Sequence, residues 1–235
     1  MKPSNLVLQS ATGSLIMQQG LIQEFALALN AKITEQKANG CIRLHQISFS
    51  DDLHKSIEHR CFEAKIDLFW ESQQRQLSDF KLVAMDMDST LITIECIDEI
   101  ADMQGLKPQV SEITEAAMRG EIKDFQESLR RRVGLLEGVS ADVLEAVYRE
   151  RLQPNPGAVE LLAGAHQRGL YTLLVSGGFT FFTEKLRQQL GFKQTQANTL
   201  EIIDGKLTGK VLGDIVDGAA KAAYKTKNTF NVVLI

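Results

Sequence analysis

Lys81-Leu-Val-Ala-Met-Asp86-Met-Asp88-Ser89-Thr90 is an apolar run that ends in two aspartates and two hydroxyl residues. The apolar part predicts a buried strand, and side chains two residues apart on a strand share one face. We therefore expect Asp86 and Asp88 to project toward one reacting group at the carboxyl end of a parallel strand, where open α/β sheets bind ligands. The alternative is an aspartate turn that caps the next helix. For an isolated D-x-D this alternative is preferred, because short motifs match by chance.

The longer string favours a catalytic site. Asp86-Met-Asp88-Ser89-Thr90-Leu matches the D-x-D-x-T/S pattern of the haloacid dehalogenase superfamily, and the chain resembles the phosphoserine phosphatase branch of that superfamily. Further matches follow in the family's order: Thr93-Ile-Glu95-Cys-Ile-Asp98-Glu99-Ile-Ala, Val175-Ser176-Gly177-Gly178-Phe179, Asp204-Gly205-Lys206-Leu-Thr208-Gly209 and Gly213-Asp214-Ile-Val-Asp217. The resemblance runs from Lys81 to Lys221 and implies removal of phosphoryl groups through an aspartyl-phosphate.

The composition favours a protein that acts on small molecules. The 235 residues have room for two domains with buried apolar cores, and a net charge of -4 argues against a general nucleic-acid-binding protein. Cys41, Cys61 and Cys96 form no C-x-x-C pair and are expected to be reduced thiols. Because the chain has no signal-peptide h-region and no apolar stretch of about twenty residues, we expect a cytoplasmic protein without a membrane span.

The N-terminal part, residues 1–78, has the pattern of a small α+β domain. Leu15–Leu29 is helix-like, whereas Cys41–Phe49 and Ala64–Trp70 alternate as antiparallel strands do. By resemblance this is an ACT/ferredoxin-like domain that binds an amino acid as a regulatory ligand. An appendage that only packs against the rest of the protein fits the sequence equally well.

The remainder predicts an α/β core, a Rossmann-like parallel sheet of the haloacid dehalogenase type, with an inserted helical cap. We assign residues 79–95 and 154–235 to the core. Residues 96–153 have a helical apolar pattern throughout and are assigned to the cap. A helix from Ala158 is expected to end at Gly169, a favourable C-cap, before the chain re-enters the sheet.

The resemblance implies a Mg²⁺ ion held by Asp86 and Asp88. A phosphate monoester carries about two negative charges, so attack by a carboxylate meets repulsion that a cation compensates. Asp86 is then the nucleophile, and Asp88 protonates the leaving seryl oxygen, deprotonates the attacking water and offers its backbone carbonyl to the metal. Proximity to Asp86 raises the pKa of Asp88 and Mg²⁺ lowers it, and the sequence does not decide which effect dominates.

Three more residues are assigned to phosphate binding. Ser176 and Gly177 stand between a strand and a helix-like segment, so a hydroxyl and backbone N–H groups face a phosphate at a helix N-terminus. An ordinary strand-to-helix turn is the alternative, and it would be preferred without Asp86 on a neighbouring strand. Lys221 matches the family's third-motif lysine, which neutralises the phosphoryl group. By itself, a lysine on an alanine-rich helix is usually exposed to solvent.

Two residues are assigned to recognition of an amino-acid substrate. By resemblance, Glu95 pairs with the ammonium of O-phospho-L-serine, and the planar fork of Arg132 binds its carboxylate. The three side chains of Arg130-Arg131-Arg132 point in different directions on a helix, so a solvated surface is expected for two of them. Met118 and Phe125 match the apolar cap wall over the substrate, although packing of the helices explains them equally well.

The family's fourth motif, G-D-G-x-N-D, has no match after Lys221. That motif supplies another Mg²⁺ aspartate and a substrate-contacting asparagine. We therefore expect an incomplete sheet and weakened metal binding, in a chain that is shortened or frameshifted at its C-terminus. The missing part includes a strand beside the first-motif strand, and an exposed apolar edge invites aggregation. Asn231-Val-Val-Leu-Ile235 is a candidate substitute strand at this edge.

These observations leave three functional hypotheses. The first is a Mg²⁺-dependent phosphoserine phosphatase that releases L-serine from O-phospho-L-serine in serine biosynthesis. The second is a related phosphatase for another small phosphometabolite. The third is a catalytically impaired amino-acid-binding protein, which the absent fourth motif favours. The expected partners are the small-molecule substrate and an amino acid at the N-terminal domain, and a homodimer stays open.

Overall fold

The computed structural model describes residues 3–10, 18–36, 40–72, 75–218 and 232–234. The chain forms two compact units, Met1–Gln76 and Leu77–Ile235, and each is described by itself. The expected domain boundary, after residue 78, lies close to this division. Within the described segments, no helix has the length and apolar character needed to cross a membrane.

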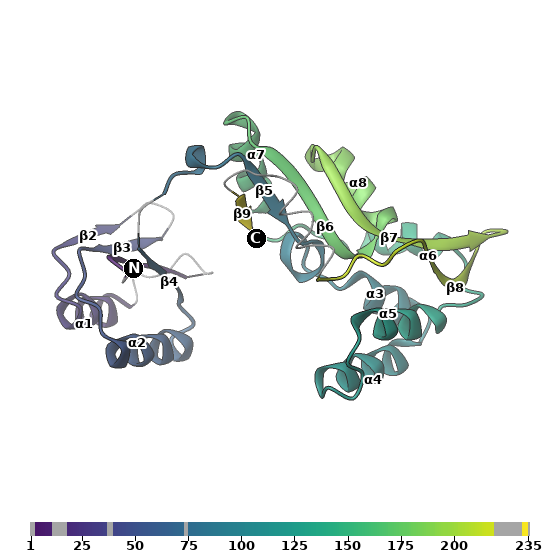
Figure 1. Ribbon diagram of the computed structural model, residues 1–235, viewed down its shortest axis with the longest axis horizontal. Helices are drawn as coiled ribbons and strands as arrows, with labels where there is room; N and C mark the ends of the chain where they lie inside the picture. Colours follow the sequence, from purple (N-terminus) through teal and green to yellow (C-terminus); the bar gives the residue numbers. More distant parts are fainter. Residues whose placement is uncertain (1–2, 11–17, 37–39, 73–74, 219–231, 235) are drawn as a thin grey trace. The chain divides into compact units, whose positions relative to one another are not determined.

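The first unit is a four-stranded antiparallel sheet with two helices. Its elements are β1 (Asn5–Gln9), α1 (Gln19–Ala28), β2 (Ile33–Gln36), β3 (Ile42–His45), α2 (Asp51–Glu63) and β4 (Asp67–Glu71). The strand order is β2-β3-β1-β4, and every neighbouring pair is antiparallel. Both helices lie on one side of the sheet (Figure 1), and Leu6 and Leu8 of β1 pack with Phe25 and Ile57 of the helices. The predicted α+β arrangement with antiparallel pairing is confirmed.

The second unit contains a five-stranded sheet in the order β8-β7-β6-β5-β9. The strands are β5 (Leu82–Met85), β6 (Tyr171–Phe179), β7 (Gln194–Ile203), β8 (Lys206–Leu212) and β9 (Val232–Leu234). β5 pairs parallel with β6 and β9, and β6 pairs parallel with β7. β8 pairs antiparallel with β7, and the hairpin turns at Asp204 and Gly205, both with positive φ. The predicted α/β fold with a parallel sheet is confirmed, with one antiparallel strand at its edge.

Strand β6 is buried on both faces, as is usual for a central parallel strand. Residues 172–175 are all buried. Leu174 belongs to the main core, to which α7 (Ala158–Gln167) and α8 (Thr180–Leu190) also contribute side chains. Leu173 and Val175 pack instead with Val216 in a second cluster. The chain that follows β8 therefore covers part of the other face.

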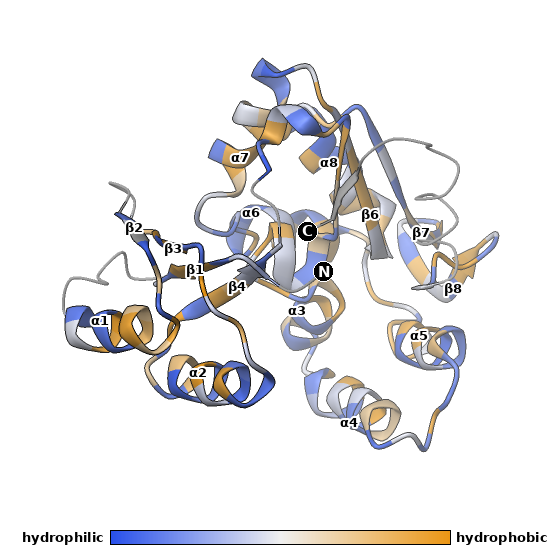
Figure 2. Ribbon diagram, turned by 60° about the vertical axis from the view of Figure 1, so that its left-hand side comes forward, coloured by the Kyte–Doolittle hydropathy of each residue, from blue (hydrophilic) through white to orange (hydrophobic). Residues whose placement is uncertain are grey.

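Four helices lie between β5 and α7. They are α3 (Cys96–Met103), α4 (Lys107–Met118), α5 (Phe125–Gly134) and α6 (Asp142–Glu150), so the predicted helical character of this region is confirmed. α4 and α5 carry both hydrophilic and hydrophobic residues (Figure 2), and Val110, Leu129 and Val133 of these helices are buried in the main core. The Asp124 carboxylate caps α5, because it accepts a hydrogen bond from the Gln126 N–H at 3.0 Å.

Strand β9 lies beside β5, the strand that carries the first motif. The two strands are parallel, with Leu82 opposite Val232 and Ala84 opposite Leu234. The prediction that the last residues pair with this strand is confirmed for Val232–Leu234. β5 consequently has a neighbour on each side, and the exposed edge that we expected there does not occur.

Deletion of residues 231–235 is expected to destabilise the second unit, because β5 would lose its ladder with β9. Loss of a few backbone hydrogen bonds corresponds to about 2 kcal/mol and a decrease in Tm of about 5 °C. Thermal unfolding and light scattering measure the two consequences, lower stability and aggregation. The control is deletion of Ile235 alone, which leaves the paired residues Val232–Leu234 in the chain. An unchanged Tm after the longer deletion would contradict a stabilising role for β9.

Candidate active site

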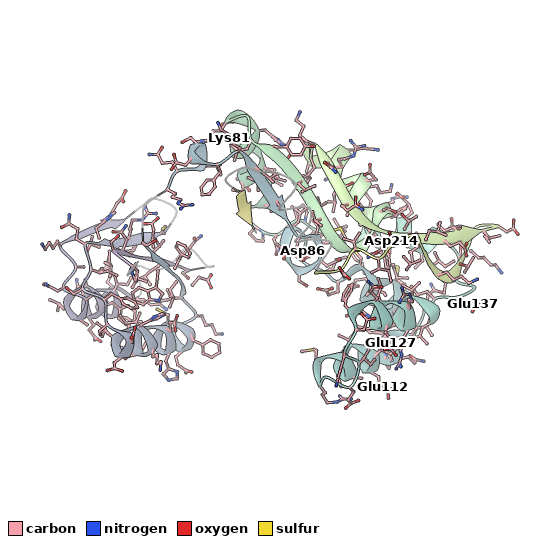
Figure 3. The ribbon with its side chains drawn as sticks, viewed as in Figure 1. Lys81, Asp86, Glu112, Glu127, Glu137 and Asp214 are labelled. Carbon is pink, nitrogen blue, oxygen red and sulfur yellow. The ribbon has the colours of Figure 1, made fainter. Side chains whose placement is uncertain are left out.

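The chain leaves the sheet at the two aspartates. β5 ends at Met85, and the single turn Met87–Leu91 follows, with Asp86 in an extended conformation before it. Ser89 has a φ of 54°, an uncommon value for a residue with a side chain, and the Ser89 N–H donates to the Ile94 carbonyl at 3.1 Å. Lys81 and Asp86 mark opposite ends of β5, with Asp86 at the end nearer the helical segment (Figure 3).

A cavity of about 340 Å³ opens at this end of the sheet. Asp86 and Asp88 both line it. Its walls come from the strand ends, from the helical segment and from the chain after β8. The lining residues are Asp86, Asp88, Glu95, Ile97, Phe125, Leu129, Arg132, Gly177, Gly178, Phe179, Val216, Asp217 and Gly218.

The carboxylate of Asp88 is held on both of its oxygens. Oδ1 accepts a hydrogen bond from the Cys96 N–H at 2.9 Å, and Oδ2 accepts one from the Ser176 hydroxyl at 3.2 Å. Burial raises the pKa of Asp88, hydrogen bonds from Cys96 and Ser176 oppose this rise, and the charge of Asp86 adds to it. Asp88 is therefore placed to hold a proton at a higher pH than an exposed aspartate does.

The Ser176–Gly178 segment approaches Asp88 so closely that glycine is required. The Gly178 N–H donates to the Ser176 hydroxyl oxygen at 2.8 Å. A Cβ at Gly178 would lie 2.5 Å from Asp88 Oδ2, and a Cβ at Gly177 would lie 2.9 Å from the ring of Phe125. Helix α8 begins directly afterwards, at Thr180. The predicted order of strand and helix is confirmed, but Ser176–Gly178 is a bulge within β6, which continues to Phe179, and not a separate turn between β6 and α8.

Glu95 and Arg132 reach the cavity from two different elements, the start of α3 and the helix α5. Glu95 precedes α3 and accepts a hydrogen bond from the Ser89 hydroxyl at 2.6 Å, while Arg132 lies on α5. Burial raises the pKa of Glu95, and burial lowers the pKa of Arg132. Each group is thus partly removed from water, which makes a ligand of opposite charge favourable.

The neighbouring arginines point away, as predicted. Arg130 and Arg131 are exposed, and their side chains bond to Gln126 and Glu127 on the same helix. Only Arg132 of the three lines the cavity.

The expectation for the apolar cap wall holds for one of its two residues. Phe125 lines the cavity, but Met118 is 83% exposed and does not. Met118 stands at the end of α4, where helical periodicity does not distinguish a site wall from an exposed helix end. Lys221 lies outside the described residues.

The structure adds two polar residues that the sequence did not indicate. Gln126 Nε2 donates to Asp217 Oδ2 at 2.9 Å, which joins α5 to the chain after β8 beside the cavity. The two residues are 91 positions apart. The sequence named Asp217 only as the last residue of the family match Gly213–Asp217, without a role. No local pattern marks Gln126, because the fold brings its partner near.

Comparison with known proteins identifies the class. The family described as haloacid dehalogenase-like hydrolase matches residues 83–229, which is more than half of the chain. The chain belongs to this family of hydrolases.

Particular relatives are phosphoserine phosphatases. The enzyme of that name from Polaromonas sp. is 59% identical over 150 residues, which are 62% of this chain and 64% of the relative. The chain thus spans less than two thirds of this relative's length. The solved structure of a probable phosphoserine phosphatase from Vibrio cholerae has a TM-score of 0.74 at 31% identity and covers 99% of this chain and 72% of that one.

A third similar structure is titled as a phospho-aspartyl intermediate analogue of phosphoserine phosphatase. It has a TM-score of 0.60 at 37% identity and covers 66% of this chain and 76% of that one.

Replacement of Asp88 by asparagine is expected to raise stability at neutral pH. An aspartate with a raised pKa in the folded state destabilises the fold once it is ionised, so its penalty appears as pH rises from its ordinary value of about 4 through the folded-state pKa. Asp88→Asn removes this penalty. The Tm of Asp88→Asn at pH 7 is expected to be a few degrees higher than that of the native chain, which is the change that about 1 kcal/mol produces in a chain of this size.

Thermal unfolding at pH 4 and pH 7 in the presence of a chelator measures this effect. The control is Asp214→Asn, the same chemical change at an exposed position outside the cavity. A gain in Tm that is as large at pH 4 as at pH 7 would contradict an origin in the buried charge.

Proposed function

We propose that the protein is a Mg²⁺-dependent phosphatase that hydrolyses O-phospho-L-serine to L-serine and phosphate. The observation that carries the proposal is one cavity lined by a pair of aspartates, a glycine-rich turn and two oppositely charged side chains. The names of the relatives support the same activity. They do not favour the alternative of an impaired amino-acid-binding protein.

The donor set at the strand end fits Mg²⁺ as a partial site. Among the residues that the structure describes, no group of three or more His, Cys, Asp or Glu side chains is arranged to hold a metal ion. Mg²⁺ commonly keeps several waters and binds through one or two carboxylates together with phosphate oxygens. The Asp86 carboxylate and the Asp88 backbone carbonyl would be its protein ligands. When bound, the ion would neutralise negative charge on the phosphoryl oxygens.

Asp86 acts as the nucleophile in this proposal. The Met87 N–H donates to Asp86 Oδ1 at 2.8 Å and orients the carboxylate at the strand end. A carboxylate oxygen of Asp86 forms a bond to phosphorus, and the bond from phosphorus to the seryl oxygen breaks. Water then attacks phosphorus and releases phosphate from the aspartyl-phosphate. The related structure titled as a phospho-aspartyl intermediate analogue supports this route.

Asp88 transfers the protons of both steps. In its neutral form it donates a proton to the leaving seryl oxygen, and as a carboxylate it takes a proton from the attacking water. Its raised pKa favours the neutral form that the first step needs. The Cys96 N–H and the Ser176 hydroxyl hold the carboxyl in one orientation. Asp88 is therefore positioned without any need for the substrate to order it.

The phosphoryl group is held by the turn and the third-motif lysine. The Gly177 backbone N–H would donate to its oxygens, near the end of β6 and just before α8. Ser176, which the sequence assigned to the phosphate, is fully buried and does not line the cavity, and its one hydroxyl proton is donated to Asp88 Oδ2, so Ser176 supports the site through Asp88. Lys221 is assigned by resemblance to neutralise the same group.

Glu95 and Arg132 select the amino-acid part of the substrate. Glu95 would pair with the ammonium and Arg132 with the carboxylate. Phe125, 42% exposed, covers Gly177 as an apolar wall.

Several broader expectations remain proposals. The β-α-β-β-α-β order of the first unit and its strand order support an ACT/ferredoxin-like domain. An amino-acid ligand there, a homodimer and a cytoplasmic location stay predictions.

The activity is tested by phosphate release from O-phospho-L-serine with and without Mg²⁺. Asp86→Asn keeps the size of the side chain but removes the nucleophile, so the rate is expected to fall at least about a thousandfold. Asp214→Asn is the matched control and should retain activity. Equal rates for the native chain and Asp86→Asn would contradict the covalent route.

Substrate selection is tested with two truncated esters. O-phosphoethanolamine lacks the carboxylate of phosphoserine, and 3-phosphonooxypropanoate lacks its ammonium. Arg132→Lys is expected to reduce the preference for phosphoserine over O-phosphoethanolamine, and Glu95→Gln is expected to reduce the preference for phosphoserine over 3-phosphonooxypropanoate. Each decrease should be about 10- to 100-fold, the range for a hydrogen bond to a charged group.

The ratio of kcat/KM values for each pair of esters measures the preference. Arg131→Lys, on the exposed side of the same helix, is the control. If each variant lost the same factor against both esters, the separate assignments of Glu95 and Arg132 would be wrong.

A further inference from the structure

Asn198 on β7 is a buried polar residue outside the cavity lining, with a side chain that is 1% exposed. Its side-chain amide both donates and accepts a hydrogen bond. Nδ2 donates to the Gly177 carbonyl at 2.7 Å, and Oδ1 accepts from the Val216 N–H at 2.8 Å. A primary amide suits this place because it carries a donor and an acceptor on one planar group.

The Gly177 carbonyl needs a side-chain donor because the strand ladder is interrupted there. Val175 of β6 pairs with Gln196 of β7, and the next pair is Phe179 with Asn198. β6 thus advances by four residues while β7 advances by two, and Ser176–Gly178 bulges out of the ladder. A buried carbonyl without a partner is unfavourable, and Asn198 supplies the donor that β7 does not.

The Gly177–Gly178 peptide is consequently held from both sides. Its carbonyl accepts from Asn198, and its N–H, which points the opposite way in a trans peptide, donates to the Ser176 hydroxyl oxygen. The Ser176 hydroxyl in turn donates to Asp88 Oδ2. The donors all point toward Asp88, an arrangement in which hydrogen bonds strengthen one another.

The other end of this series is the chain after β8. Val216 is 3% exposed, and its neighbours Asp217 and Gly218 line the cavity. Asn198 therefore connects two separate wall segments of the cavity, the turn at Ser176–Gly178 and residues 216–218.

We infer that Asn198 is a positioning residue for catalysis. Asn198 orients the Gly177–Gly178 peptide and, through Ser176, the Asp88 carboxyl. It also holds residues 216–218 in place beside the segment Ser176–Gly178. This inference rests on the proposed phosphatase function for its effect on the rate, but the hydrogen-bond series itself is independent of that function.

Two variants distinguish the hydrogen bond that Asn198 Nδ2 donates from the one that Oδ1 accepts. Asn198→Ala removes both hydrogen bonds. Asn198→Asp keeps an acceptor for the Val216 N–H but turns a carboxylate oxygen toward the Gly177 carbonyl. The control is Thr172→Val, since Thr172 is a fully buried polar residue of β6 whose hydroxyl contacts His166 and the Lys193 N–H, away from the cavity.

Kinetics on O-phospho-L-serine give the first readout. Both Asn198 variants are expected to lower kcat about 10- to 100-fold, the range for loss of an orienting partner, with less than about a threefold change in KM. KM changes little because Glu95 and Arg132 are untouched. Thr172→Val should lower stability without this loss in kcat. Native kcat in Asn198→Asp would overturn the inference.

Amide hydrogen exchange gives a second readout that needs no activity. In Asn198→Ala, the Gly178 and Val216 amides are expected to exchange at least about tenfold faster, because both lose order. In Asn198→Asp only the Gly178 amide should do so, and in Thr172→Val neither. An unchanged Gly178 amide in both Asn198 variants would overturn the inference whatever the kinetics show. If exchange behaves as expected but the native chain releases no phosphate, the phosphatase proposal fails and the positioning network stands.

Discussion

The parallel pairing of β5 with β6 is the constraint on which the site depends. It places Leu82 opposite Tyr171 and Met85 opposite Leu174, so the chain leaves β5 beside the last part of β6, which contains Ser176–Gly178. Asp88 and Ser176, 88 residues apart in sequence, then meet through a hydrogen bond at the shared end of the sheet. A shift of register would separate the aspartates from Ser176–Gly178, because the aspartates follow β5 directly and Ser176–Gly178 belongs to β6. β9 on the other side of β5 helps to hold this register.

Burial of charge gives the cavity its chemical character. Desolvation is the largest influence on the pKa values of Asp88, Glu95 and Arg132. In each case it shifts the pKa in the direction that favours the neutral form of the side chain. Such groups are unfavourable in an isolated fold and become favourable when a ligand supplies opposite charge. A substrate with a phosphate, an ammonium and a carboxylate supplies charges of both signs. The structure thus gives up some stability at the place where a zwitterionic ester would restore it.

The helical segment completes the site from the other side of the cavity. Phe125, Leu129 and Arg132 lie about one turn apart on α5 and line the cavity together. Gln126 on the same helix bonds to Asp217, and a side chain at Gly177 would collide with Phe125. One helix thereby supplies the apolar wall, the guanidinium and a polar link to the chain after β8. Because Phe125 lies so close to Gly177, the position of α5 depends on the segment Ser176–Gly178, which Asn198 holds through the Gly177 carbonyl.

Sequence alone determined the local features whose physics is local. The apolar run that stops at Asp86, the helical region after Glu95 and the end of α7 follow from periodicity and residue preference over a few positions. α7 ends at Gln167 with Arg168 as its C-cap, and Gly169 follows with the positive φ that glycine adopts readily. The pairing of the last strand was also predictable, because Val232–Leu234 is a short apolar run and β5 needed a neighbour. Tertiary structure alone decided which residues meet. Met118 and Phe125 have the same apolar character, but only Phe125 faces the cavity. Asn198, Gln126 and Asp217 owe their importance to partners between 18 and 91 residues away. Their hydrogen bonds depend on strand register and helix packing, and no local pattern of residues encodes either one.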